Sequence, residues 1–268
     1  FCQMHDFIYF KNTKISFSTK GKGTAVVLLH GFLENASMWD SVAGVLSKTN
    51  RVICIDLLGH GQTGCLGYVH AMETMAAAVD AVLNHLRIRK SILVGHSLGG
   101  YVALAFAEEN PDNVKGLCLM NSTARADSEE RRALRDRAID VVKREYNNVV
   151  KNSISNLFRP KNRLLFKEEI KRVKKEALQT PLQGYIAAQE GMKIRNDREV
   201  LLHFSPYKKM MILGKKDPVL PFGDLLDQVQ HTEVEVVVFP DGHMSHIENK
   251  EALLVALKRF VKGCKISS

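Results

Sequence analysis

The segment SILVGHSLGGYVALAFAEE, residues 91–109, places a serine between two glycines. Its residues Gly95 to Gly99 match the pattern G-x-S-x-G, with Ser97 at the centre. An apolar run typical of a strand precedes the pattern, and a run with helical periodicity follows it. A sharp turn from strand to helix lifts the serine hydroxyl to the carboxyl edge of a sheet, and small neighbours relieve the crowding. The context therefore predicts that Ser97 is a nucleophile, against the alternative of a small residue in a tight turn.

A serine hydroxyl is a weak nucleophile, so it needs a base to take its proton and an acid to orient that base. Asp217 follows an apolar run late in the chain, and His243 and His246 follow the next such run. The chain order serine, acid, histidine is the order used by enzymes with a nucleophile at a strand-to-helix turn. We therefore predict Asp217 as the acid and one of the two histidines as the base.

These residues must be positioned by a regular scaffold. Continuous apolar runs suit strands that are covered on both faces of a parallel sheet. Alternating strands and helices predict an α/β fold with a doubly wound, mostly parallel sheet. Two earlier runs, 6–10 and 14–19, are predicted to pair as antiparallel strands at the edge. The other predicted strands are 25–30, 51–56, 91–95, 114–120, 209–214 and 234–239, and the predicted helices between them are 38–48, 75–87, 101–110, 224–230 and 251–262.

The alternation stops between about residues 123 and 205. This segment is charged, and we expect three helices in it, over residues 128–154, 166–178 and 182–195. We therefore predict a core made of residues 1–122 and 206–268, with residues 123–205 inserted as a helical cap. Residues 123–202 hold 19 Lys and Arg against 12 Asp and Glu, and so contribute most of the net charge of +9. An anionic substrate would fit this excess, but the mixture of both signs at helical spacing favours solvated helix faces.

Composition limits the class of protein. Hydrophobic residues make up 45% and charged residues 25% of the 268 residues, which is typical of a soluble globular protein. No apolar run approaches the roughly 20 residues of a membrane span, and no basic tract interleaved with aromatic residues suggests nucleic acid. The first residues lack the pattern of a signal peptide. The cysteines are odd in number and show no C-x-x-C spacing, so we expect no disulfide framework, no zinc site and a cytoplasmic location; they are Cys2, Cys54, Cys65, Cys118 and Cys264.

Five segments together resemble the α/β-hydrolase superfamily. They occur in the order typical of that superfamily, at plausible intervals and over essentially the whole chain. The segments are LLHGFLENASMWD, IDLLGHGQT, GHSLGG, LGKKDPVLP and DGHMSHIENKEALLVALKRF. The resemblance implies that the catalytic histidine directly follows a glycine after the last strand, which selects His243 over His246. It also selects Asp217 over Asp56 as the acid, because Asp56 precedes Ser97.

The resemblance further implies an oxyanion hole and a framework around it. Acyl transfer builds negative charge on a carbonyl oxygen, which two main-chain N–H groups can hold. The corresponding amides belong to Phe32 and Leu98. Trp39 and the loop with Asp56, His60 and Gly61 are expected to shape the site, and His30, His60 and His96 are expected to make structural hydrogen bonds. From their positions beside the triad, we expect a pocket lined by Phe32, Trp39, His96, Leu98, Val219, Leu220 and Met244.

We therefore expect a serine hydrolase that cleaves a small carboxylic ester or related acyl substrate through Ser97, His243 and Asp217. No metal or organic cofactor is required. The alternatives are a carbon–carbon bond hydrolase or a lyase like that of menaquinone synthesis, both on the same triad, or a ligand-binding receptor of this fold. Dehalogenases and epoxide hydrolases of the superfamily are excluded, since they carry Asp where this chain has Ser97. The expected partner is a small-molecule substrate, and an oligomer is compatible with the sequence.

Overall fold

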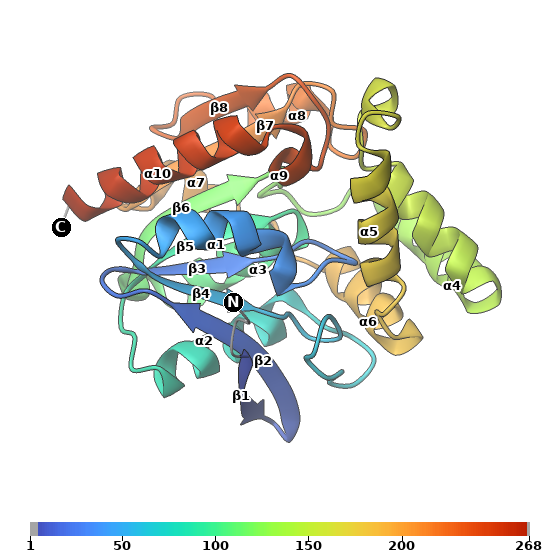
Figure 1. The fold of residues 1–268 in the computed structure, drawn as a ribbon, viewed down its shortest axis with the longest axis horizontal. Helices are drawn as coiled ribbons and strands as arrows, with labels where there is room; N and C mark the ends of the chain where they lie inside the picture. The colour runs from blue at the N-terminus through green and yellow to red at the C-terminus, as the bar shows by residue number, and fades with distance from the viewer. Residues whose placement is uncertain (1–4, 267–268) are drawn as a thin grey trace.

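A computed structural model describes residues 5–266 and contains one mixed sheet of eight strands. The order across the sheet is β1-β2-β4-β3-β5-β6-β7-β8 (Figure 1). The first two strands pair antiparallel, and β2 also runs antiparallel to β4, whereas all other neighbours are parallel. The expected fold, including the antiparallel pair at the edge, is confirmed. The strands are β1 (His5–Phe10), β2 (Thr13–Lys20), β3 (Ala25–Leu29), β4 (Arg51–Ile55), β5 (Ser91–His96), β6 (Val114–Met120), β7 (Lys208–Gly214) and β8 (Glu235–Phe239).

Helices cover both faces of this sheet, as the continuous apolarity of its central strands requires. On one face, α2 (Met72–His85) and α3 (Leu98–Glu109) share an apolar cluster with Val27 and Leu93. On the other, α1 (Asp40–Leu46) and α10 (Lys250–Ile266) share a second cluster with Val26 and Val94. Each fully buried side chain of this size stabilises the fold by roughly 1.5–3 kcal/mol. The sheet therefore provides a rigid support for the loops at its carboxyl edge.

Residues 121–207 contain helices and no strand. The three principal helices are α4 (Glu129–Ser155), α5 (Lys167–Ala177) and α6 (Leu182–Lys193), close to the predicted spans. They lie together at the right-hand side of Figure 1, and the arrowhead of β3 points toward them. A third apolar cluster joins these helices to Leu33 and Met244, which lie in loops that follow strands of the sheet. The helical segment thus packs at the carboxyl edge of the sheet.

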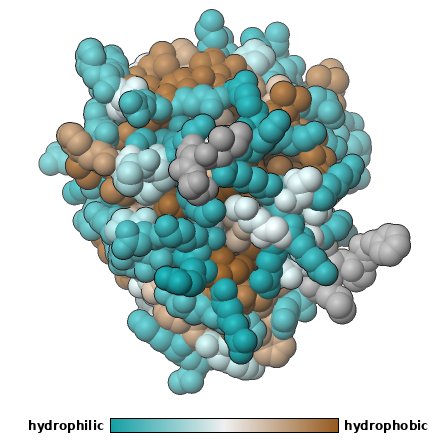
Figure 2. All heavy atoms as spheres, turned by 90° about the vertical axis from the view of Figure 1, so that its left-hand side faces the viewer, coloured by the Kyte–Doolittle hydropathy of each residue, from teal (hydrophilic) through white to brown (hydrophobic). Residues whose placement is uncertain are grey.

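Several short helices were not predicted, because three to five residues show too little periodicity to identify. They include α7 (Val200–Phe204), α9 (Ser245–Glu248) and the 3₁₀ turns η1 (Ala36–Trp39), η2 (Pro111–Asn113) and η3 (Pro160–Asn162). The predicted helix over 224–230 is α8 (Phe222–Asp227). No helix within residues 5–266 combines the length and the apolar character needed to cross a membrane. The face on the left of Figure 1 is covered mainly by hydrophilic residues, with apolar patches between them (Figure 2).

Candidate active site

Ser97 occupies the turn between β5 and α3 with φ 49° and ψ −112°. This left-handed backbone is rare for a residue with a side chain, and it is the strained conformation expected of a nucleophile at a sharp turn. The Ser97 N–H donates to the Met120 carbonyl oxygen at 3.0 Å, which fixes the turn against β6. A Cβ at Gly99 would lie 2.3 Å from the Leu29 carbonyl oxygen, and a Cβ at Gly95 would lie 2.3 Å from that of Gly99. Gly99 therefore allows the turn to approach β3 closely, and Gly95 allows the strand and the helix to meet in a tight turn.

Asp217 and His243 meet at the carboxyl ends of β7 and β8. His243 Nδ1 donates to Asp217 Oδ2 at 2.7 Å, and both side chains are almost completely buried. The other carboxylate oxygen, Oδ1, accepts from the Val219 and Leu220 amides at 2.8 and 3.1 Å. Burial by itself would raise the pKa of Asp217, but the charge and hydrogen bond of His243 and the two amides hold it below its ordinary value. Asp217 is therefore ionised and accepts the hydrogen bond from His243 Nδ1. His243 Nε2 is then the ring nitrogen that can accept a proton.

Asn121 ties the two loops together, and the sequence alone did not identify this role. It directly follows β6 with φ 45°, and its Nδ2 donates to Asp217 Oδ2 at 3.1 Å and to the Gly242 carbonyl oxygen at 3.2 Å. Its Oδ1 accepts from Ser245 Oγ at 2.6 Å. The only available signal was a polar residue at the end of a buried strand. One side chain therefore fixes the acid and the loop of the histidine.

The amides of Phe32 and Leu98 are the oxyanion donors that the sequence predicts. Leu98 is the first residue of α3, where a main-chain N–H has no acceptor inside its own helix. Phe32 follows β3, and its side chain lines the same cavity as Ser97. Within residues 5–266, neither main-chain N–H has a hydrogen-bond acceptor. Both donors are therefore free to bind a developing negative charge.

A buried carboxylate and a buried histidine form hydrogen bonds with the backbone around these residues. His96 Nδ1 donates to Glu34 Oε2 at 2.6 Å, and His96 Nε2 donates to the His243 carbonyl oxygen at 3.0 Å. A carbonyl oxygen only accepts, and a carboxylate only accepts when it is ionised, so both contacts with an ionised Glu34 require a proton on each ring nitrogen of His96. Glu34 also accepts from the Gly31 N–H at 3.0 Å, beside the expected oxyanion hole. The sequence reasoning missed Glu34 because its partner is 62 positions away.

The pKa values in this cluster agree with an ionised pair. Burial would raise the pKa of Glu34, but the charge and hydrogen bond of His96 hold it at about 2. Burial would lower the pKa of His96, but the charge and hydrogen bond of Glu34 outweigh it and raise this pKa. His246, with Nε2 at 3.4 Å from Glu34 Oε1, has its pKa lowered to about 4, mainly by burial. The pair thus carries one negative and one positive charge, and His246 stays neutral.

A cavity of about 100 Å³ holds Ser97 and His243 in its wall. Of the pocket residues expected from the sequence, Phe32, His96 and Val219 line it, whereas Trp39, Leu98, Leu220 and Met244 do not. The other lining residues were not predicted, and many of them come from the helical segment. They are Leu33, Glu34, Tyr101, Arg131, Arg135, Ser153, Ile154, Leu157 and Met192.

The expected pocket is therefore corrected at several positions. Trp39 is completely buried in the apolar cluster on the α1 and α10 side of the sheet, where its large apolar surface is removed from water. Met244 packs among the helices of the 129–193 segment, and Leu220 lines a second, larger cavity. Leu98 is buried beneath the turn, so that its amide remains the relevant group. Sequence neighbours of reactive residues thus point into the core as often as into the site.

Comparison with known proteins places the chain in a family. The family model described as the alpha/beta hydrolase fold matches residues 24–250. The chain belongs to the α/β-hydrolase fold family. A pimeloyl-[acyl-carrier protein] methyl ester esterase of Aliivibrio salmonicida is 26% identical, covering 93% of this chain and 97% of that protein. A thermophilic esterase of Thermogutta terrifontis, solved with malate bound, has a TM-score of 0.91 at 29% identity, covering 97% of this chain and 99% of the other.

A longer relative matches only in part. The dihydrolipoyllysine-residue acetyltransferase component of the acetoin cleaving system of Pseudomonas putida is 29% identical over 90% of this chain. This α/β hydrolase spans 64% of the length of that relative.

The remaining polar residues that the family resemblance singled out make structural contacts in this α/β hydrolase. Asp56 accepts from the Ala36 amide at 2.8 Å and from the Gln62 amide at 2.9 Å, so its carboxylate orders loops and does not contact His243. His30 Nε2 accepts from the Leu57 amide at 2.9 Å. These contacts fit the framework role expected for them.

The described part of the chain offers few side chains for metal binding or for catalysis by cysteine. Residues 5–266 contain no group of three or more His, Cys, Asp or Glu side chains placed to hold a metal ion. Cys54, Cys65, Cys118 and Cys264 are free thiols, and Cys2 lies outside the described residues. Burial raises the pKa of the Cys54 thiol to about 12, so that it is a poor nucleophile.

Proposed function

We propose that this α/β hydrolase is a serine hydrolase that cleaves a small carboxylic ester or a related acyl substrate. The observation that carries the proposal is the sharing of one cavity by Ser97, on its strained turn, and His243, hydrogen-bonded to a buried Asp217. A nucleophile, a base and an orienting acid are the three groups that acyl transfer needs. The esterases among its relatives support the same reaction class.

The proposed mechanism assigns one role to each of these residues. His243 Nε2 takes the Ser97 proton as Ser97 Oγ forms a bond to the substrate carbonyl carbon. The amides of Phe32 and Leu98 hold the oxyanion, and His243 then donates the proton to the leaving alcohol as the carbon–oxygen bond breaks. A water molecule, deprotonated by the same histidine, attacks the acyl enzyme. The bond between the acyl carbon and Ser97 Oγ then breaks, which releases the carboxylic acid, and His243 returns the proton to Ser97 Oγ.

Residues 123–205 would act as a cap that limits which substrates reach Ser97. Arg131, Arg135, Ser153, Ile154 and Leu157 of this segment line the cavity with the catalytic residues. A volume of about 100 Å³ suits a short acyl chain. The His243 N–H donates to the Leu157 carbonyl oxygen at 2.9 Å, which links the cap directly to the proposed base. Substrate size would therefore be set by α4 and the residues that follow it.

A serine-directed fluorophosphonate tests the proposal. We expect the wild-type protein to be labelled and to hydrolyse p-nitrophenyl acetate and butyrate faster than the octanoate. Ser97→Ala should abolish both labelling and turnover, while Ser47→Ala, a partly exposed serine outside the cavity, should change neither. A wild-type protein that is not labelled, or equal labelling of Ser97→Ala, would contradict the proposal. Binding of an ester without turnover in the wild type would favour a receptor.

A further inference from the structure

The walls of the catalytic cavity carry four charged residues besides the proposed base. They are Glu34, His96, Arg131 and Arg135. Glu34 and His96 neutralise each other through their contact of 2.6 Å. Arg135 forms an ion pair with the buried Asp127 and donates to Gln189 Oε1 at 2.8 Å. Three of the four charges are therefore compensated within the protein.

Arg131 is different. It lies in the first turn of α4 and is half-buried, and its main-chain N–H donates to Ser128 Oγ at 3.2 Å. Within residues 5–266, its guanidinium has neither an ion-pair partner nor a hydrogen-bond acceptor. Arginine keeps its proton under all ordinary conditions. The cavity wall thus carries one uncompensated positive charge.

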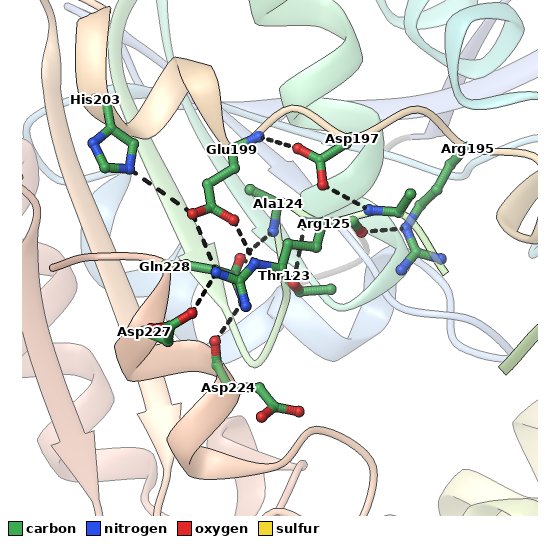
Figure 3. Close-up of polar contacts among 11 residues, drawn as sticks. Thr123, Ala124, Arg125, Arg195, Asp197, Glu199, His203, Asp224, Asp227 and Gln228 are labelled. Atoms are coloured by element: carbon green, nitrogen blue, oxygen red, sulfur yellow. Dashed lines mark hydrogen bonds and ion pairs between the residues drawn. The ribbon is translucent and has the colours of Figure 1, made fainter. Parts of the chain in front are cut away.

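The other arginines around Arg131 already form ion pairs with carboxylates of the protein. A second cavity of about 510 Å³ shares Arg131 and Val219 with the catalytic cavity and is also lined by Arg125 and Arg195. Figure 3 shows Arg125 directed at Glu199 and Asp227, while Arg195 reaches the Arg125 carbonyl oxygen. Arg195 Nη1 also pairs with Asp127 Oδ1 at 2.6 Å. Arg131 is therefore the cation at the junction of the two cavities that remains available to a ligand.

The acids near this junction would not neutralise Arg131. Asp127 is buried and held by Arg135 and Arg195. Glu130 and Asp224 line the larger cavity but are exposed to water, where charges interact weakly. A carboxylate on a substrate, in contrast, would meet the guanidinium in a partly desolvated wall, where a bidentate charge-assisted pair is stronger.

We propose that Arg131 binds an anionic group of the substrate, so that the preferred substrates are esters that also carry a carboxylate. Monoesters of short dicarboxylic acids are the simplest members of this class. This inference rests on the proposed serine hydrolase function. The small catalytic cavity takes the acyl chain, and Arg131, which lines the same cavity as Ser97, holds the far carboxylate. The side chain acts on specificity and takes no part in bond making.

The test compares monomethyl glutarate with methyl butyrate, which lacks the distant carboxylate. We expect Arg131→Gln to lower kcat/KM for monomethyl glutarate about 10-fold or more, as for loss of a hydrogen-bonded charge pair, and to leave methyl butyrate within about twofold. Arg132→Gln is the matched control, because it removes the same charge from the next position of α4, an exposed residue that lines neither cavity. An equal loss on both esters, or an equal effect of Arg132→Gln, would overturn the proposal.

A binding measurement separates this inference from the reaction itself. Monomethyl glutarate is titrated into Ser97→Ala and into the Ser97→Ala, Arg131→Gln double variant, with the uncharged methyl butyrate as the reference ligand. Weaker binding of monomethyl glutarate by the double variant, with unchanged binding of methyl butyrate, supports the anion site even if no ester is hydrolysed. Equal binding of monomethyl glutarate by the two proteins overturns it, even if the wild type proves to be an esterase.

Discussion

Asp217 illustrates how much a single residue contributes to the proposed catalytic site. Its carboxylate holds His243 with Nδ1 protonated, and an amide in its place would favour the wrong tautomer. We expect Asp217→Asn to lower kcat by roughly 10³- to 10⁴-fold, by analogy with serine proteases, with little change in the far-ultraviolet circular dichroism spectrum. Asp112→Asn, an exposed acid of η2, is the control and should retain full activity. A loss of less than tenfold would argue that Asp217 is not the orienting acid.

The pair of Glu34 and His96 makes a second prediction at the same scale. Because both ring nitrogens of His96 face acceptors, we expect two ring N–H signals for it by ¹⁵N NMR at pH 8, where an ordinary histidine is neutral. Glu34→Gln removes the charge that raises the pKa of His96. The His96 ring in this variant should then lose one proton at pH 8. We also expect kcat to fall about tenfold with KM little changed, because His96 is no longer held firmly as the hydrogen-bond donor to the His243 carbonyl oxygen. A single ring proton in the wild type at pH 8 would contradict the ion pair.

At the scale of elements, α6 is pressed against the loop that precedes α2. A Cβ at Gly191 would lie 1.7 Å from the His70 carbonyl oxygen, and neither backbone can move away without unpacking. Alanine favours helix over glycine by about 1 kcal/mol, but here we expect Gly191→Ala to destabilise the protein by roughly 1–3 kcal/mol through overpacking. Gly44→Ala in α1 is the matched control, because within residues 5–266 no atom beyond its own stretch of helix lies within 4 Å of an added Cβ, and it should stabilise by about 0.5–1 kcal/mol. Urea unfolding measures both values, and equal effects would show that the close contact is absent.

At the scale of the whole molecule, buried histidines couple stability to pH. Burial lowers the pKa of His60 to about 3 and the pKa values of His70 and His246 to about 4. In the unfolded chain these groups titrate near 6.5, so below that pH the unfolded state binds more protons than the folded state. The free energy of unfolding should therefore decrease as the pH falls from about 6.5 toward 4. His96, whose pKa is raised, contributes in the opposite direction.

Urea unfolding at fixed ionic strength between pH 7.5 and 5 checks this coupling. We expect the free energy of unfolding to drop by on the order of 3 kcal/mol over that range. His246→Gln should make the dependence shallower, because one of the histidines whose pKa burial lowers is removed. A free energy of unfolding that is constant between pH 7 and 5 would show that these histidines are not held neutral by burial.

The amino-acid sequence by itself determined the sheet, the turn at Ser97 and the loops of Asp217 and His243. These features depend on local patterns: apolar runs form strands, glycines permit the turn, and parallel strands bring their carboxyl ends to one edge. Only the tertiary structure decided which side chains surround the serine. Glu34 and Asn121 reach the site through contacts between residues far apart in the chain, and Arg131 lines its cavity from α4, whereas Trp39 and Met244 turn into apolar clusters. Such orientations follow from the packing of α4–α6 on the sheet edge, and no local pattern in the sequence records that packing.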